Sequence, residues 1–327
     1  MTRHRDRRVA RGRVRVNSRF WRLDRQTLQG FERSNRRESE TQTSALTKDL
    51  PAVRLELSSR PVSVTLVRGV LAALGEALAL DPELLDDLKT AISEACNNVV
   101  LHAYPDAVGP MLVELAVSRT RVEVAVQDFG TGIQHLSPSD ERMGVGLAVI
   151  SALAERAEFL SEPDSGTTVK MSFAGGSRAV AESDPTGVGA VPTAAEIELS
   201  GEVVATVTPV GLLARVLGRA ARATAARAHF TVDRFADLTL ITDALGEYAT
   251  QSHDGEPVGF SIRSAPRRLE LAIGPLRSGS GAGVPESATG AEVAATLGRL
   301  ADELRVEPAA EYELLRVVFA DRSREQS

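Results

Sequence analysis

The stretch Ala91–Tyr104 constrains the fold of this chain more than any other, because its pattern is helical while three polar residues share one line. Glu94 and Asn98 are four residues apart, so on a helix they lie on one face, one turn apart, and His102 continues the line. Asn98 offers a carbonyl oxygen to Mg²⁺, which prefers oxygen ligands, and Glu94 can act as a general base. The stripe predicts a polar pocket, although an ordinary solvated helix face would carry the same residues.

The next motif follows a predicted strand. Val122–Val126 alternates apolar and polar residues and leads into Asp128, Gly130 and Gly132. Glycines let the backbone turn sharply and approach a ligand closely, and an aspartate can accept a hydrogen bond from the exocyclic amine of adenine. The segment predicts either an adenine contact or a plain turn.

Two further motifs complete the series. Gly144 and Gly146 precede an apolar-periodic helix, whose first N–H groups and positive dipole end can bind a phosphate. Thr167 opens a last predicted strand, and its hydroxyl could help to hold the base, directly or through water. Each signal is weak alone.

In this order, the wording E-A-x-x-N-x-x-x-H-A-Y, D-x-G-x-G-I, G-x-G-L and G-T-T-V resembles the GHKL, or Bergerat-fold, ATPase superfamily. Within it, the motifs look like those of anti-sigma-factor serine/threonine kinases of the RsbW type, over residues 51–174. The resemblance and the intermixed helices and strands predict an α+β fold, a two-layer α/β sandwich with a mixed sheet and helices on one face.

The resemblance implies a role for each motif residue. Glu94 would polarise the attacking hydroxyl, and Asn98 would hold the Mg²⁺ that bridges the phosphates of ATP. Asp128 would read adenine, with Thr167 assisting. The glycines that would shape the pocket and the hinges of a lid are Gly130, Gly132, Gly144 and Gly146.

A short lid is expected at Gln134–Met143. Arg142 at its end would either reach the terminal phosphate or be solvated. His102 would either orient the Mg²⁺ face or cap a helix.

The implied activity is that of an ATP- and Mg²⁺-dependent protein serine/threonine kinase. It would phosphorylate an antagonist protein of the STAS fold and sequester a sigma factor. A non-catalytic, nucleotide-gated adaptor stays open as an alternative. A sensor histidine kinase fragment is disfavoured, because no phosphoacceptor helix precedes the ATPase region and His4 is its only upstream histidine.

A chain of 327 residues has room for two domains. Cys96 is the single cysteine, which excludes an internal disulfide, suits a reducing compartment and predicts a small buried thiol. The sequence has no run of 18 apolar residues and no evident secretory signal. We therefore expect a cytoplasmic protein without a membrane span.

Charge is distributed unevenly. Residues 1–37 hold 13 arginines against three acidic residues, a net +10, which leaves −16 for the rest of a chain of net charge −6. Their low hydrophobicity predicts that residues 1–50 form an Arg-rich disordered head. The head could bind nucleic acid or an acidic partner unspecifically, be an inert tail, or result from an upstream start codon; no motif indicates specific nucleic-acid binding.

Periodicity predicts the remaining elements. Strands are expected at Val53–Leu57, Met111–Val117, Arg121–Val126 and Thr167–Phe173, and helices at Pro61–Leu80, Leu84–His102 and Gly146–Glu158. Residues 175–194 are rich in Gly, Pro and Ser and predict an interdomain linker.

The second half of the sequence echoes the first. Four segments recur in order at offsets of about 146–149 residues, namely Ile241–Ala244, Leu269–Ile273, Leu300–Asp302 and Leu315–Phe319. They predict a degenerate GHKL-like domain at residues 195–320, with chance similarity of helices and strands as the alternative.

In this register the nucleotide residues are lost. Glu247 stands at Asn98, Pro275 at Asp128, Arg277 at Gly130, Ala291 and Val293 at Gly144 and Gly146, and Glu313 at Thr167. We therefore expect no comparable ATP site in the second domain. Because the resembling family is generally dimeric, we hypothesise that this domain replaces a second subunit in an intramolecular pseudo-dimer, with a homodimer as the alternative.

Overall fold

A computed structural model describes residues 51–132, 145–162, 165–177, 199–253, 257–279, 288–309 and 311–322. Every described residue belongs to one compact unit. The Arg-rich head, the lid Gln134–Met143 with Arg142, Gly144 and most of the predicted linker lie outside the described residues.

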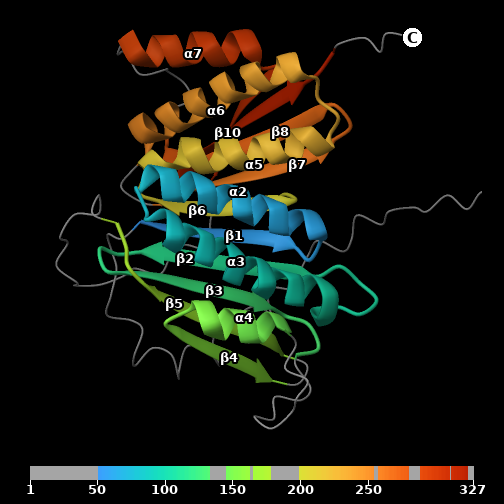
Figure 1. The fold of residues 1–327 in the computed structure, drawn as a ribbon. Coiled ribbons are helices and arrows are strands. Elements are labelled where there is room, and N and C mark those ends of the chain that lie inside the picture. The colour runs from blue at the N-terminus through green and yellow to red at the C-terminus, as the bar shows by residue number, and fades with distance from the viewer. Residues whose placement is uncertain are drawn as a thin grey trace, which may run out of the picture. The chain divides into compact units, whose positions relative to one another are not determined.

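The first half of the described unit intermixes helices and strands (Figure 1). Its elements are β1 (Ala52–Ser58), α2 (Pro61–Ala77), α3 (Pro82–Asn98), the π-helix η2 (Val99–Ala103), β2 (Pro110–Val117), β3 (Arg121–Asp128), α4 (Val145–Leu153), β4 (Arg156–Glu162) and β5 (Gly166–Ala174). The predicted strands and the first two predicted helices are confirmed, apart from the π-helical end of the second.

The second half repeats this order of elements. They are β6 (Val203–Thr208), the 3₁₀-helix η3 (Val210–Leu212), α5 (Leu213–Arg227), α6 (Val232–Ser252), β7 (Val258–Ala265), β8 (Arg268–Arg277), α7 (Ala288–Leu300), β9 (Glu303–Pro308) and β10 (Tyr312–Ala320). No helix among the described residues is long and apolar enough to cross a membrane.

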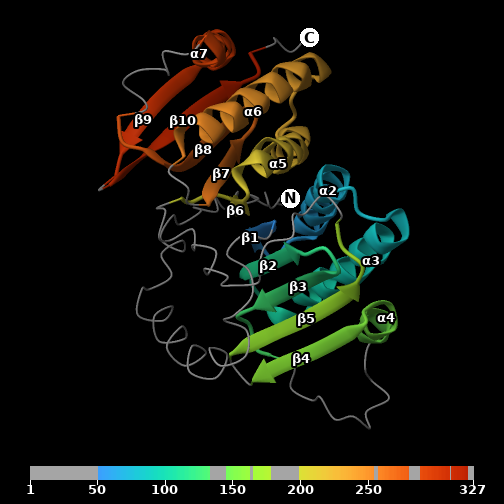
Figure 2. The same cartoon turned by 90° about the vertical axis from the view of Figure 1, so that its left-hand side faces the viewer.

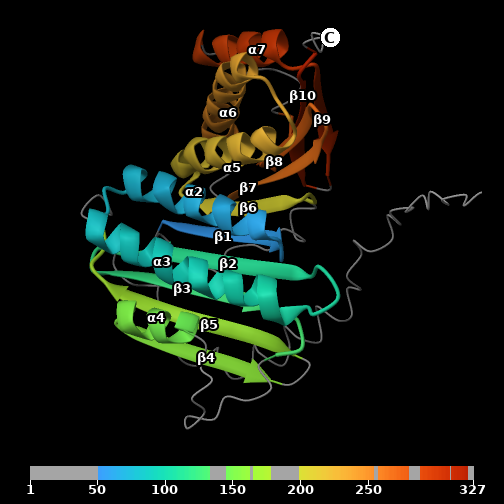
Figure 3. The same ribbon diagram turned by 45° about the vertical axis from the view of Figure 1, so that its right-hand side comes forward.

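The described strands form one sheet in the order β4-β5-β3-β2-β1-β6-β7-β8-β10-β9, and the helices cover one of its faces (Figures 2 and 3). The predicted two-layer arrangement is confirmed. The predicted mixed sheet is wrong, because every described strand pair is antiparallel. Two helices separate β1 from β2, so β2 runs back along β1. A single helix connects β3 to β4, so these two strands run in the same direction. They do not pair with each other, because β5 lies between them.

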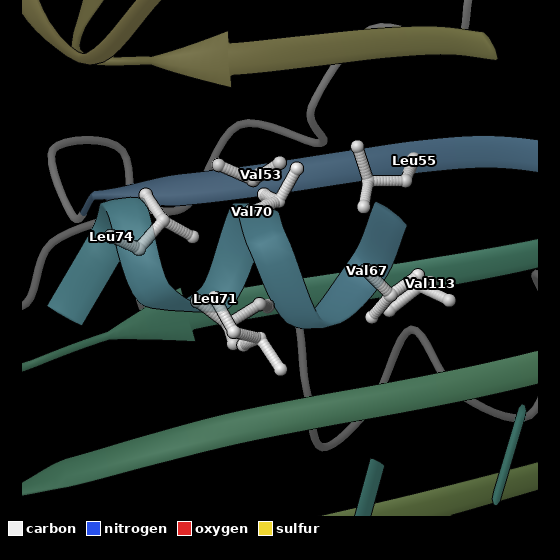
Figure 4. Close-up of a pocket in the computed structure, with 8 residues that line it drawn as sticks. Val53, Leu55, Val67, Val70, Leu71, Leu74 and Val113 are labelled. Atoms are coloured by element: carbon white, nitrogen blue, oxygen red, sulfur yellow. The ribbon is translucent and has the colours of Figure 1, made fainter. Parts of the chain in front are cut away.

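The core lies between the helices and the inner face of the sheet. Val53 and Leu55 of β1 alternate with half-buried residues and face Val70 and Leu74 of α2 (Figure 4). Only aliphatic side chains line the small void between them, whose volume is about 10 Å³. A void of this size without polar partners stays dry, so the helix packs tightly on the sheet.

One predicted helix is wrong in its second half. The helix expected at Gly146–Glu158 ends at Leu153, and β4 begins at Arg156. Ala157 and Phe159 are partly buried while their neighbours are exposed, and this two-residue alternation is that of an edge strand. The apolar residues of this segment fit both the helical period and the two-residue period of a strand, and pairing with β5 favours the strand.

The two halves join where β1 pairs with β6. The pairing is antiparallel and runs from Ala52 opposite Thr208 to Leu57 opposite Val203. On the helical layer, Arg219 of α5 pairs with Glu76 of α2 at 3.1 Å. The described residues of both halves therefore form one compact unit with a continuous sheet.

Candidate functional site

Helices α3 and α4 bring three predicted site residues together. A methyl group on Gly146, in the first turn of α4, would lie 2.9 Å from Oε2 of Glu94 and 3.5 Å from Oδ1 of Asn98. A side chain at this position would displace the carboxylate of Glu94, so glycine leaves that carboxylate in place beside the start of α4. The carboxylate, the amide and the start of α4 thus border one small space.

The amide of Asn98 is incompletely bonded in that space. Its Nδ2 is buried and has no hydrogen-bond partner among the described residues. Leaving a buried polar atom unpaired costs about 1–3 kcal/mol, so such an atom in a folded protein needs an explanation. A ligand that binds beside the amide is one.

The donor set at this position fits Mg²⁺ better than a metal held by protein alone. Among the described residues, no group of three or more His, Cys, Asp or Glu side chains could hold a metal ion. Mg²⁺ takes one or two protein oxygens and completes its shell with phosphate and water. The side-chain oxygen of Asn98 would suffice as that protein ligand.

Asp128 lies at the end of β3 and is 4% exposed. Its Oδ1 accepts hydrogen bonds from the N–H of Gly130 at 2.9 Å and from the N–H of Thr167 at 3.3 Å. Burial raises the pKa of its carboxyl group above the usual value. The two backbone hydrogen bonds lower this pKa, but the effect of burial is larger. The carboxylate is held in a fixed orientation by the loop after β3 and by the start of β5.

The loop after β3 that contains Gly130 and Gly132, called the glycine loop below, packs on the π-helix η2. A methyl group on Gly130 would collide with the carbonyl oxygen of Ala103 in η2, and that oxygen accepts a hydrogen bond from the N–H of Thr131 at 3.1 Å. Gly132 has a φ of 71°, in the left-handed region that favours glycine. The predicted sharp turn is therefore present, and it joins the end of β3 to the end of the helix that carries Glu94 and Asn98.

Tyr104 is a site residue to which the sequence analysis gave no role. Its hydroxyl donates to the carbonyl of Pro110 at 2.6 Å and accepts from the N–H of Phe129 at 2.8 Å. Burial raises its pKa to about 12, so the hydroxyl stays protonated. The only sequence signal for Tyr104 was its place in the H-A-Y motif. Its two hydrogen-bond partners lie 6 and 25 residues further along the chain.

Thr167 is 8% exposed at the start of β5, and its hydroxyl lies 3.1 Å from that of Ser161 on β4. Ser161 was missed because the sequence analysis did not predict β4. His102 is exposed on η2, where the wider π turn takes it off the line of Glu94 and Asn98. Cys96 is fully buried, as predicted, and burial raises its pKa to about 12.

A protein-family model supports the interpretation of the first half as an ATPase domain. The model described as "Histidine kinase-like ATPase domain" matches residues 57–173, which include every described site residue named above. The fold and the site thus define a GHKL-type ATPase domain.

Three similar proteins identify the family within this class of ATPases. The anti-sigma F factor of Thermoanaerobacter pseudethanolicus is 31% identical over 131 residues, covering 36% of this chain and 90% of the relative. Those of Clostridium perfringens (34% over 105 residues; 28% and 75%) and Pasteuria penetrans (31% over 132 residues; 36% and 88%) are similar. The chain belongs to the RsbW-like anti-sigma-factor family of GHKL ATPases.

A solved structure, the histidine kinase domain of the blue-light activated histidine kinase from Erythrobacter litoralis EL346, also matches. The match is 19% identical, covers 35% of this chain and 60% of that chain, and has a TM-score of 0.25, which is too low to bear on the fold.

Proposed function

We propose that this chain is an ATP- and Mg²⁺-dependent protein serine/threonine kinase of the anti-sigma type. The observation that carries the proposal is the buried Nδ2 of Asn98, which has no hydrogen-bond partner among the described residues, one helical turn from Glu94 and with the start of α4 beside both side chains. An ordinary solvated helix face would leave neither a buried unpaired amide nor a glycine pressed against it.

The residues divide the work of phosphoryl transfer. Asn98 would hold Mg²⁺, which neutralises charge on the phosphates when bound. Glu94 would take the proton from the attacking hydroxyl, and Asp128 would accept a hydrogen bond from the adenine amine, with Thr167 beside it. Gly130, Gly132, Gly144 and Gly146 would shape the pocket around the nucleotide.

The partner classes rest on the names of the relatives, which are anti-sigma F factors. By that likeness, the chain would sequester a sigma factor and phosphorylate a serine or threonine on an antagonist protein of the STAS fold. These interactions would take place in the cytoplasm.

The decisive test separates transfer from binding. Labelled ATP and Mg²⁺ are incubated with the protein and candidate antagonists, and labelled protein is measured alongside ATP affinity. Glu94→Gln should lower transfer by about 100-fold or more while ATP still binds. Glu123→Gln, an exposed carboxylate on β3, is the control. If wild-type protein binds ATP and its partner but transfers nothing, the adaptor alternative replaces the kinase.

Residues 195–320 would be a degenerate copy of residues 51–174. Equivalent strands pair in the same register in both halves. Val53 lies opposite Leu115 as Val203 lies opposite Ile262, Val113 opposite Val126 as Phe260 opposite Ile273, and Val122 opposite Phe173 as Leu269 opposite Phe319. The matched registers support duplication over chance similarity of elements.

The copy would have lost its nucleotide residues. Counted from the first residues of α3 and α6, Ala244 stands at Glu94 and Tyr248 stands at Asn98, so the pairing of Asn98 with Glu247 is off by one residue. Tyr248 is buried and has a phenol ring in place of the amide that would hold a metal. Extending the strand registers by one residue would put Pro275 at the position of Asp128. In this proposal the second half takes the place of a second subunit, and the chain is an intramolecular pseudo-dimer.

A further inference from the structure

The hydroxyl of Tyr104 lies between the end of β3 and the start of β2. It accepts a hydrogen bond from the N–H of Phe129 at 2.8 Å and donates one to the carbonyl of Pro110 at 2.6 Å. Burial raises its pKa to about 12, so the hydroxyl is protonated at neutral pH and can donate and accept together. One side-chain oxygen therefore joins the two strands where their ladder ends.

The two backbone groups that it joins belong to the next pair of the ladder. β3 ends at Asp128, and the register of β2 and β3 would next place Phe129 opposite Pro110. In an antiparallel ladder every second pair is directly hydrogen-bonded. At the hairpin end the N–H of Ser118 donates to the carbonyl of Arg121 at 2.8 Å. Counting by twos from there along the register makes Pro110 and Phe129 such a pair.

The hydroxyl replaces the direct bond of this pair. Proline has no N–H, so the only bond that the pair could form runs from the N–H of Phe129 to the carbonyl of Pro110. Tyr104 stands between this donor and this acceptor and holds them further apart than a direct bond would. The chain after Asp128 is thereby led out of the sheet and into the glycine loop.

The surrounding backbone fixes the ring of Tyr104. A methyl group on Gly109 would collide with the ring, which packs directly on the glycine backbone. The N–H of Gly109 donates to Oγ of Ser59 at 3.0 Å, and its carbonyl accepts from the N–H of Ser59 at 2.8 Å. Tyr104 also packs against the hydrophobic core. The hydroxyl is therefore placed by the fold before any ligand binds.

Fixing Phe129 fixes the carboxylate next to it. Phe129 stands between Asp128 and Gly130, and the N–H of Gly130 donates to Oδ1 of Asp128 at 2.9 Å. On the other side of the loop, the carbonyl of Ala103 leaves no room for a side chain on Gly130. Ala103 and Tyr104 are neighbours in the chain, and together they hold the backbone on which the direction of Asp128 depends.

We propose that Tyr104 is a positioning residue, whose hydroxyl directs the carboxylate of Asp128 toward the amine of adenine. The inference rests on the proposed function, in which Asp128 reads the base. Tyr104 acts without touching the nucleotide, because its proton is donated to Pro110. Without the hydroxyl, Phe129 can bond Pro110 directly, and this extra rung would draw the chain after Asp128 toward β2.

The test compares ATP with purine riboside triphosphate, which lacks the 6-amino group and cannot use the carboxylate of Asp128. The affinities of both nucleotides for the full chain, with Mg²⁺, are measured by calorimetric titration. Wild-type protein should bind ATP about tenfold or more tightly than the analogue, because the analogue leaves a buried acceptor unpaired. Tyr104→Phe should reduce this preference to about threefold or less, chiefly by weakening ATP binding.

A merely structural role of Tyr104 predicts a different result. Loss of packing or of stability would weaken the two nucleotides equally and leave the preference intact. The double variant Tyr104→Phe with Asp128→Asn should show the same preference as Asp128→Asn alone, since the hydroxyl acts through that carboxylate. A further loss of preference in the double variant, or a preference that Tyr104→Phe retains, overturns the inference.

Two single variants complete the test. Gly109→Ala keeps the hydroxyl but pushes the ring aside, so it should reduce the preference as Tyr104→Phe does. An unchanged preference in Gly109→Ala overturns the inference even if Tyr104→Phe fails to fold. Tyr312→Phe removes a hydroxyl from β10 in the second half and is the control, in which the preference should not change.

The wild-type measurements separate this inference from the proposed function. Wild-type protein that binds no ATP overturns both. Wild-type protein that binds the two nucleotides equally well overturns the inference, because Asp128 then does not read the amine. A preference for ATP that the variants at Tyr104 and Gly109 retain overturns the inference alone and leaves the proposed function in place.

Discussion

At the residue scale, two carboxylates in one domain have different environments. Asp128 is buried and bound by two backbone N–H groups, whereas Glu94 is only partly buried and faces the start of α4. A fixed, oriented acceptor suits recognition of a base. A carboxylate beside an open space suits proton transfer.

Asn98→Ala should separate binding from stability. Removing the proposed metal ligand should weaken Mg²⁺-dependent ATP binding by about tenfold or more. The free chain should lose little stability, because the substitution also removes a buried, unpaired polar atom. Calorimetric titration and thermal unfolding measure the two effects. A large fall in Tm with unchanged ATP affinity would show that the amide is structural.

Asp128→Asn should weaken ATP binding by about 10- to 100-fold, because the amide can present a donor to the adenine amine where the carboxylate accepts. The pKa of Asp128 is raised in the folded protein, so its charge is unfavourable to the ligand-free fold above that pKa. The variant should therefore be at least as stable as wild type at neutral pH.

The same shift predicts a pH dependence of binding. As the pH falls through the raised pKa, Asp128 takes up a proton and loses its acceptor role, so the affinity for ATP should fall at a higher pH than an ordinary aspartate would give. Titrations over a pH series, with Asp128→Asn as the baseline, isolate this effect. Parallel curves for the two proteins would exclude Asp128 as the adenine contact.

Sequence reasoning reached some of these residues and missed others. Glu94 and Asn98 could be predicted to share a helix face from their spacing, and the resemblance to GHKL ATPases implied that Gly146 borders the same pocket. Tyr104 and Ser161 could not, because their hydrogen bonds join segments that meet only in the folded sheet.

At the scale of elements, the π-helix distinguishes the two halves. Helix α3 changes to the π-helix η2 after Asn98, whereas α6 continues as an α-helix to Ser252. π-turns occur often at functional sites, and here the π-turn supplies the carbonyl of Ala103 that packs against the glycine loop. The apolar spacing of the sequence suggested one continuous α-helix and gave no sign of it.

Helix α4 offers a prediction of its own. Gly146→Ala should raise or preserve stability, since alanine is favoured over glycine in helices by about 1 kcal/mol. Its methyl group would meet Glu94, and displacing the base should lower phosphoryl transfer by about 100-fold.

Gly69→Ala in α2 is the matched control. Apart from its chain neighbours and the backbone of its own helix, no atom lies within 4 Å of the added methyl group, so the variant should gain the same stability without loss of transfer. Comparable transfer by both variants would contradict the placement of Glu94 as the base.

At the scale of the whole molecule, the antiparallel pairing of β1 with β6 occupies the edge through which the first half could otherwise extend its sheet. The proposed pseudo-dimer predicts a monomer with one ATP site. Light scattering should give the mass of a single chain, and calorimetry should give one nucleotide per chain. A stable dimer, or two nucleotides per chain, would contradict the proposal.

Because the two halves are joined in one chain, their assembly does not depend on the number of protein copies in the cell. Two separate subunits meet at a rate that depends on how many copies the cell contains, so that scarce copies remain apart. In this chain the two sides of the β1–β6 junction are synthesised together and experience a fixed local concentration. The fraction assembled is then the same in a cell with a handful of molecules as in one with thousands.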